Sequence, residues 1–150
     1  MKYVVIVIAF LSCMGGNAQT DGEMVKQAVV TFFDAFHAQD SVQLKAMMSN
    51  DMVLQTIGKN KEGETIVVQE DYHRFLQSIA SIPPTTKFEE RLNSFDIKVD
   101  GPMANAWVGY EFYVNGNFSH CGVNSFQLFK EKERWKIIYL IDTRRKEHCK

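Results

Sequence analysis

The sequence lacks several features that would narrow its function directly. It holds no long basic run and its formal net charge is −1, so nothing in it indicates a nucleic-acid partner. It also has no phosphate-binding loop, dinucleotide fingerprint or Ser-His-Asp arrangement, which leaves nucleotide-dependent and serine-hydrolase chemistry without support. With 150 residues, 45% of them hydrophobic, it is long enough to bury a core as one domain.

The first eighteen residues have the pattern of a secretory signal peptide. A basic start at Lys2 precedes the apolar run Val4–Leu11, which is too short to span a bilayer. Gly16-Asn17-Ala18 then offers small residues before a cleavage site after Ala18. The alternative, a lipoprotein signal with Cys13 as the lipidated residue, fits the residues before that cysteine poorly. We therefore expect a domain over residues 19–150 that is periplasmic or secreted, with no membrane span.

Cysteine is scarce, and removal of the signal peptide leaves only Cys121 and Cys149. An oxidising compartment permits a disulfide between them. Cys121 lies near the start of one predicted strand and Cys149 just past the end of the next, and these two ends are neighbours in an antiparallel hairpin. Two separate thiols are the alternative, and the sequence leaves both open.

Each of these cysteines follows a histidine, which raises the question of a zinc site. Neighbouring residues on a strand point to opposite faces, so His120 and Cys121 are poorly placed to bind one ion. The second pair, His148-Cys149, lies on the terminal tail. We therefore predict no metal site and no cofactor.

The first half of the chain has mainly helical spacing. Thr20 and Glu23 form a capping-box pattern before a helix with one wide apolar face. Gln39-Asp40-Ser41 ends that helix and caps a short second one. The third predicted helix, Glu70–Ile82, is ended by two prolines. Two short strands are expected between the second and third helices, over Asp51–Ile57 and Thr65–Val68.

From Lys87 onward the apolar residues alternate, which predicts strands. Asn115-Gly116 between extended runs is a strong signal for a tight hairpin. We expect four consecutive antiparallel strands over Lys87–Val99, Met103–Val114, Phe118–Lys130 and Trp135–Thr143.

This order of elements resembles the nuclear transport factor 2-like superfamily, in particular its SnoaL-like and lumazine-binding-like branches. The resemblance covers the whole domain and rests on Phe36-His37-Ala38-Gln39-Asp40, Trp135-Lys136-Ile137 and Asp142-Thr143-Arg144. It implies an α+β fold, with a cone-shaped curved antiparallel sheet wrapped around three N-terminal helices. It also implies a mostly apolar pocket at the open end of the cone, and in many members a homodimer through the outer sheet face.

Candidate ligand-binding residues come from polar side chains among the apolar and aromatic residues of the last strands. We select Tyr110, His120, Asn124 and Asp142. Asp142 ends an apolar strand, where a desolvated carboxylate could act as a general base. The alternative is that it pairs with Arg144 on the same face and closes the strand.

Glu111, between Tyr110 and Phe112, is the second catalytic candidate, with an outward-facing strand residue as its alternative. His37, near the end of the first helix, is placed to reach a pocket mouth, although a histidine there often interacts only with the last helix carbonyls.

These observations favour a secreted pocket protein that binds a small, largely apolar or aromatic ligand without catalysis. The alternative is an isomerase-like or cyclase-like enzyme, which in the resembled superfamily moves a proton with a pocket carboxylate. Against the isomerase, the first helix offers Phe32, Phe33 and Phe36 where a tyrosine donor would be wanted. A second alternative is a module for self-association or partner binding through outer-face aromatics such as Trp107 and Tyr113.

Overall fold

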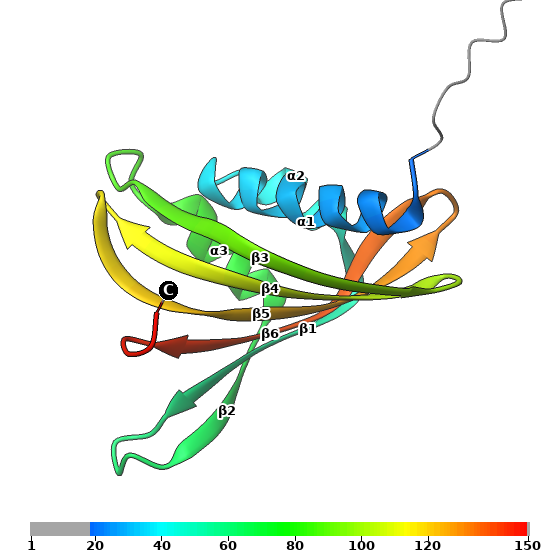
Figure 1. Cartoon of the computed structure of the whole chain (residues 1–150). Coiled ribbons are helices and arrows are strands. Elements are labelled where there is room, and N and C mark those ends of the chain that lie inside the picture. Colours follow the sequence, from blue (N-terminus) through cyan, green and yellow to red (C-terminus); the bar gives the residue numbers. More distant parts are fainter. Residues whose placement is uncertain (1–18, 150) are drawn as a thin grey trace, which may run out of the picture.

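Three helices and six strands make up residues 19–149, the part of the chain that the computed structural model describes. The strands form one sheet in the order β2-β1-β6-β5-β4-β3, with the helices on one side of it (Figure 1). The elements are α1 (Asp21–His37), α2 (Ser41–Met47), β1 (Met48–Lys59), β2 (Thr65–Glu70), α3 (Tyr72–Ser81), β3 (Phe88–Asp100), β4 (Met103–Val114), β5 (Asn117–Glu131) and β6 (Arg134–Arg145). The predicted α+β class is confirmed, with a sheet that is curved but not closed.

The predicted signal peptide and its cleavage site after Ala18 lie outside the described residues, as does Cys13. Among residues 19–149, no helix is both long and apolar enough to cross a membrane.

Helix α1 begins with the predicted capping box. The Thr20 hydroxyl accepts a hydrogen bond from the Glu23 N–H at 3.3 Å, and the Glu23 carboxylate accepts one from the Thr20 N–H at 2.8 Å. These bonds satisfy donors that the first turn of a helix leaves free. The helix buries one face against the sheet, through Val25, Val29, Phe32, Phe33 and Ala35.

The joint between α1 and α2 is fixed by two residues, as its sequence predicts. Gln39 has a φ of 58°, a left-handed conformation that ends the helix. Asp40 then caps α2, because its Oδ1 accepts hydrogen bonds from the N–H groups of Val42 and Gln43 at 3.1 and 2.9 Å.

The four C-terminal strands form the predicted antiparallel meander, with Asn115 and Gly116 at positive φ in the hairpin between β4 and β5. The sheet is antiparallel as predicted except at one place, where β1 pairs with β6 in parallel. These two strands are separated by most of the domain, so no hairpin imposes an antiparallel direction on them.

Bulges break the strict alternation on which the predicted strand faces depend. On β6, Ile137 pairs with Leu128 and Tyr139 with Gln127, so Ile138 is an extra residue. Strict alternation would put Trp135 and Ile137 on the face opposite Leu140 and Asp142, but all four are buried on the inner side. A bulge shifts the phase of the strand and increases its local twist, which helps the sheet to curve.

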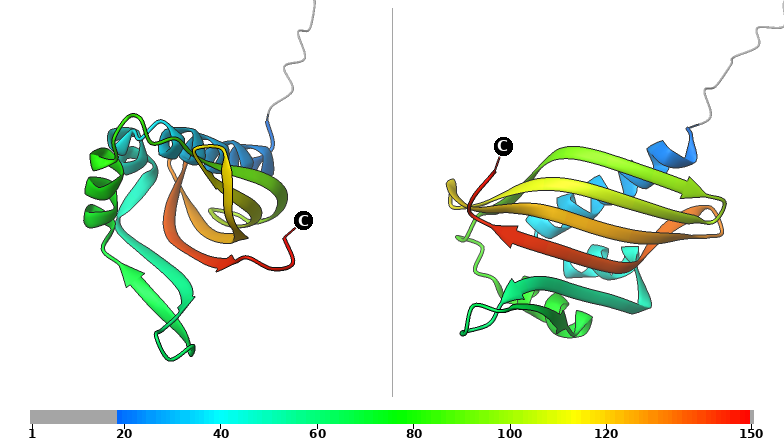
Figure 2. Two further views of the ribbon diagram at one scale, coloured as in Figure 1. Left: turned by 90° about the vertical axis from the view of Figure 1, so that its left-hand side faces the viewer. Right: turned by 60° about the horizontal axis from the view of Figure 1, so that its bottom comes forward.

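The core lies between α1 and the concave face of β4 to β6. Phe32 and Phe33 pack edge-on against Phe126 of β5, with ring centroids 5.6 and 5.9 Å apart. Figure 2 shows the sheet curving beneath α1, while the β1–β2 hairpin extends away from the other strands. Every residue of β2 is exposed.

The structure joins Cys121 and Cys149 in a disulfide, which decides between the alternatives that the sequence leaves open. Cys121 is buried at the outer side of β5, and Cys149 lies beyond the end of β6. The bridge therefore ties the C-terminal tail to the sheet.

Candidate functional site

A pocket opens between α1, α3 and the inner face of the sheet. It contains about 470 Å³ of empty space, including solvent at its open mouth. Helices α1 and α3 contribute phenylalanine rings to its wall, and the strands contribute polar side chains and two leucines. Its lining consists of Phe32, Phe33, Phe36, Leu54, Thr56, Glu70, Phe75, Glu90, Asn124, Leu140, Asp142 and Arg144.

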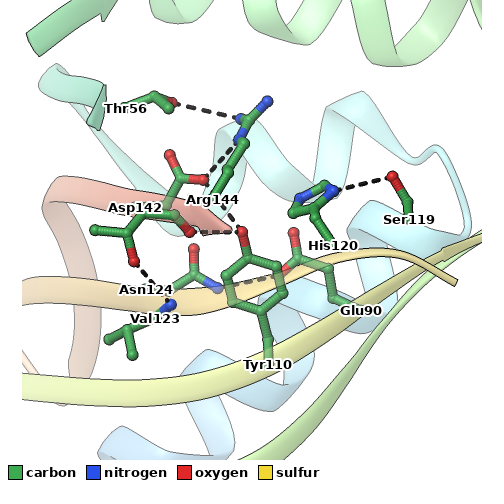
Figure 3. A network of polar contacts seen from close by, with 10 residues as sticks. Thr56, Glu90, Tyr110, Ser119, His120, Val123, Asn124, Asp142 and Arg144 are labelled. Atoms are coloured by element: carbon green, nitrogen blue, oxygen red, sulfur yellow. Dashed lines mark hydrogen bonds and ion pairs between the residues drawn. The ribbon is translucent and has the colours of Figure 1, made fainter. Parts of the chain in front are cut away.

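Glu90 is a partly buried carboxylate of this lining. It lies on β3, where its Oε2 accepts a hydrogen bond from Asn124 Nδ2 at 3.0 Å (Figure 3). Burial raises the pKa of Glu90 to about 7, and the charge of Asp142 adds to this, while Asn124 and Arg144 act in the opposite direction. Near neutral pH this side chain can therefore gain or lose a proton inside the pocket.

Asp142 is held by two neighbours at the C-terminal end of β6. Arg144 Nε donates to its Oδ2 at 2.8 Å, which is the pairing that their shared strand face predicts. The Tyr110 hydroxyl lies 3.3 Å from the same oxygen and 3.0 Å from the Thr143 carbonyl oxygen. Asp142 is 9% exposed, so this carboxylate is an almost buried, paired group at the polar end of the pocket.

Tyr110 lies behind this polar end and is buried. Burial raises its pKa, and the nearby charges of Glu90 and Asp142 raise it further, so the group stays a hydroxyl donor. The ring lies directly over Gly122. A Cβ at Gly122 would come within 2.7 Å of the ring's Cε1 atom and also collide with the Thr143 backbone, so this close approach requires glycine.

His120 lies beside Tyr110 rather than in the pocket wall. Its ring packs edge-on to Tyr110 and tilted against Phe112, and its Nδ1 is 3.0 Å from the Ser119 hydroxyl. Burial lowers the pKa of His120, and the charge of Arg144 lowers it further.

His37 connects the end of α1 to the strand that carries Glu90. Its Nε2 accepts a hydrogen bond from the Glu90 N–H at 2.8 Å, which requires that nitrogen to be unprotonated. Burial lowers the pKa of His37 and so favours the neutral ring. The imidazole therefore helps to position Glu90 through the backbone rather than reaching the pocket mouth.

The structure places the residues selected from the sequence in three different settings. Asn124 and Asp142 line the pocket, and Tyr110 supports Asp142 from behind. Glu111 points to the opposite face of β4, where its carboxylate accepts a hydrogen bond from the Tyr113 hydroxyl at 2.9 Å. It is therefore not brought into the pocket.

Sequence reasoning missed Glu90, although a signal for it was present. In Phe88-Glu89-Glu90-Arg91-Leu92, alternation puts Glu90 on the same face as the two apolar residues. A carboxylate on the apolar face of a strand is either buried in the core or part of a site. Within residues 19–149, no group of three or more His, Cys, Asp or Glu side chains is arranged to hold a metal ion.

Comparisons with known proteins agree with this architecture. The sequence pattern of the SnoaL-like domain matches residues 25–140. No curated protein is similar enough in sequence to match the chain.

Solved structures with the same fold have low sequence identity. An NTF2-like protein from Cytophaga hutchinsonii is 11% identical with a TM-score of 0.68, covering 85% of this chain and 100% of that one. An NTF2-like protein of unknown function from Pseudomonas putida KT2440 is 11% identical with a TM-score of 0.67, covering 81% and 84%. A candidate dehydratase of the NTF2-like family from Streptomyces avermitilis is 17% identical with a TM-score of 0.64, covering 83% and 96%.

The curved sheet, the helices on its concave side and the internal pocket define an NTF2-like α+β protein. Within that superfamily, the chain belongs to the SnoaL-like domain family. The narrower resemblance to lumazine-binding proteins stays a prediction.

Proposed function

We propose that this protein binds a small molecule with an apolar, ring-containing body in the pocket between α1, α3 and the sheet. The observation that carries the proposal is the mixed wall of the pocket, in which helices α1 and α3 supply phenylalanine rings and strands of the sheet supply Glu90, Asn124 and Asp142. Ligand sites commonly combine an apolar wall with a few polar groups that fix orientation. The rings would hold the body of the ligand and the polar side chains its functional group.

Thermal shift with a library of small aromatic and heteroaromatic compounds tests this proposal. A ligand present at about 100 times its Kd should stabilise the protein by about 2.7 kcal/mol and raise its Tm by several degrees. Phe75→Ala, which removes a ring of the wall, should weaken binding. Phe118→Ala is the matched control, since this exposed ring lies outside the lining. No shift across the library, or equal loss in both variants, would contradict the proposal.

Proton transfer to or from the bound molecule is the second candidate function. It is favoured by one observation, the Glu90 carboxyl group whose pKa burial raises to about 7 beside Asn124. A general acid or base is most effective when its pKa lies near the working pH. Glu90, rather than Asp142 or Glu111, would then carry the proton, and Tyr110 and Arg144 would hold Asp142 in place. Dehydration, the reaction class in the name of the Streptomyces avermitilis protein, also needs such a group.

Hydrogen–deuterium exchange of enolisable small ketones in D₂O, followed by NMR, tests proton transfer. The protein should accelerate exchange, and the rate should rise with pH through about 7 as Glu90 ionises. Glu90→Gln should abolish the acceleration, while Glu111→Gln on the outer face should leave it unchanged. Exchange that survives Glu90→Gln would contradict this role.

A further inference from the structure

The charges around the pocket are not balanced. Among the described residues, its lining contains three carboxylates, those of Glu70, Glu90 and Asp142, but one guanidinium, that of Arg144. Arg144 is engaged by Asp142 at 2.8 Å, and its Nη2 is 3.4 Å from the Thr56 hydroxyl. Within residues 19–149, neither Glu70 nor Glu90 takes part in an ion pair. The pocket therefore has a surplus of negative charge once Glu90 is ionised.

The apolar part of the wall is also suited to a cation. The Phe36 and Phe75 rings are stacked, with centroids 6.2 Å apart and planes 13° from parallel, and Phe33 meets Phe36 edge-on. Ring faces carry negative electrostatic potential and attract a cation within about 6 Å of the ring centroid. The carboxylates of the lining thus favour a positively charged group, and the aromatic rings of the same lining can hold a ring body beside it.

An anionic ligand fits this wall poorly. Its natural partner would be Arg144, but the guanidinium already neutralises Asp142, and the anion would also face Glu70 and Glu90. A neutral ligand would pack against the rings without balancing the charge of Glu90. A cation near Glu90 provides the opposite charge that this buried carboxylate lacks.

We infer that the pocket selects a ligand that carries a protonated nitrogen on an apolar ring body, of the arylalkylamine class. The ring would pack against Phe36 and Phe75, and the ammonium group would bind the carboxylate of Glu90. This inference rests on the proposed small-molecule function and specifies the charge of the ligand.

Binding should then release a proton, because an ammonium group favours the ionised form of Glu90. The titratable groups around Glu90 are Asp142 and Arg144 on β6, Tyr110 on β4, His120 on β5, Glu70 at the end of β2 and His37 on α1. The pKa values of Tyr110 and Arg144 are raised, so neither titrates near neutrality. The two histidines have lowered pKa values and are neutral there, so Glu90 accounts for the proton released near pH 7.

Three probes with one ring and different charges test the inference by titration calorimetry on the purified protein. Benzylamine is the cation, benzyl alcohol the neutral analogue and benzoate the anion. At pH 8, benzylamine should bind about tenfold tighter than benzyl alcohol, a difference of about 1.4 kcal/mol, and benzoate should bind weakest. At pH 7, titration in two buffers of different ionisation enthalpy should show release of about half a proton with benzylamine.

Two variants test whether Glu90 causes the preference for benzylamine. Glu90→Gln should remove both the preference for benzylamine over benzyl alcohol and the proton release, and Glu111→Gln should alter neither. If benzyl alcohol or benzoate binds as tightly as benzylamine, the inference is overturned but the proposed pocket function stands. If none of the three binds, the inference is overturned, and the thermal-shift library decides separately whether the proposed pocket function stands. A preference for benzylamine that persists in Glu90→Gln overturns the assignment to Glu90.

Discussion

The two faces of the sheet place the same residue type in contrasting environments. Glu90 on β3 faces inward, and burial raises its pKa to about 7. Glu111 on the neighbouring strand β4 faces outward, where Tyr113 donates a hydrogen bond to it. Both are glutamates within strands, so residue type and secondary structure alone do not distinguish them. The face of the sheet, and not the residue type, decides which glutamate has chemistry suited to a site.

The largest difference in stability is expected between alanine substitutions at two phenylalanines on β5. Phe126 is fully buried on the inner face against Phe32 and Phe33, and Phe118 is 46% exposed. Phe126→Ala should lower the free energy of unfolding by about 3–5 kcal/mol, because it leaves a cavity in the core. Phe118→Ala should cost less than about 1 kcal/mol. Urea denaturation measures both, and equal costs would contradict the assignment of faces.

Loss of the disulfide should cause the second-largest decrease in stability. The bridge between Cys121 and Cys149 closes a loop with a sequence separation of 28. A disulfide that closes a loop of that length restricts the unfolded chain and thereby stabilises the folded state by about 3–4 kcal/mol. Replacing both cysteines by serine should lower stability by roughly this amount, and a reductant should do the same to the wild type but not to the variant. Full stability under reducing conditions would argue against the bridge.

The inner glutamate should make stability depend on pH. The pKa of Glu90 is raised in the folded protein, so its contribution is fully present below the unfolded pKa of about 4.5 and is lost as pH rises through about 7. Glu90→Gln should remove this loss and stabilise the protein at pH 8 by about 2 kcal/mol. Glu111→Gln is the control, and it should leave the pH profile of the wild type unchanged. The His37→Asn variant retains Glu90, and a stability profile of this variant that is flat between pH 5 and 8 would refute the raised pKa of Glu90.

His37 should contribute a smaller effect with the opposite sign. Its pKa is lowered in the folded protein, so its stabilisation is present above about pH 6.5 and is lost as pH falls below that value. Protonation removes the acceptor of the Glu90 N–H bond, which is worth about 1 kcal/mol. In the Glu90→Gln background, denaturation curves from pH 7 to 5 should show this loss, and adding His37→Asn should reduce it. An unchanged profile after that substitution would indicate that His120, whose pKa is also lowered, accounts for the loss.

The sequence predicted the elements of this fold well where the signals are local. The capping box at Thr20 and Glu23, the joint at Gln39 and Asp40, and the hairpin at Asn115-Gly116 each depend on bonds or φ values within a few residues. The parallel pairing of β1 with β6 was not predictable in this way. It depends on contacts between strands that most of the domain separates in sequence.

The candidate site was predicted only in part, because it also depends on contacts between strands that are distant in sequence. Asn124 and Asp142 were selected as polar residues among the apolar and aromatic residues of the last strands, and both line the pocket. The extra residue Ile138 shifts the phase of β6, so strict alternation along that strand would put Trp135 and Ile137 on the wrong side. Glu90 was missed because it is one of several charged residues along β3, and the sequence of β3 alone does not show which of them faces the pocket.

The sequence by itself determined the order of helices and strands, and it identified the family through that order. Periodicity, caps and turns are properties of short segments, so they can be read one segment at a time. Only the tertiary structure decided that Glu90 faces Asn124, that Tyr110 reaches Asp142, and that the disulfide forms. These features depend on contacts between residues that are distant in sequence, and those contacts exist only when the sheet has formed and curved around α1.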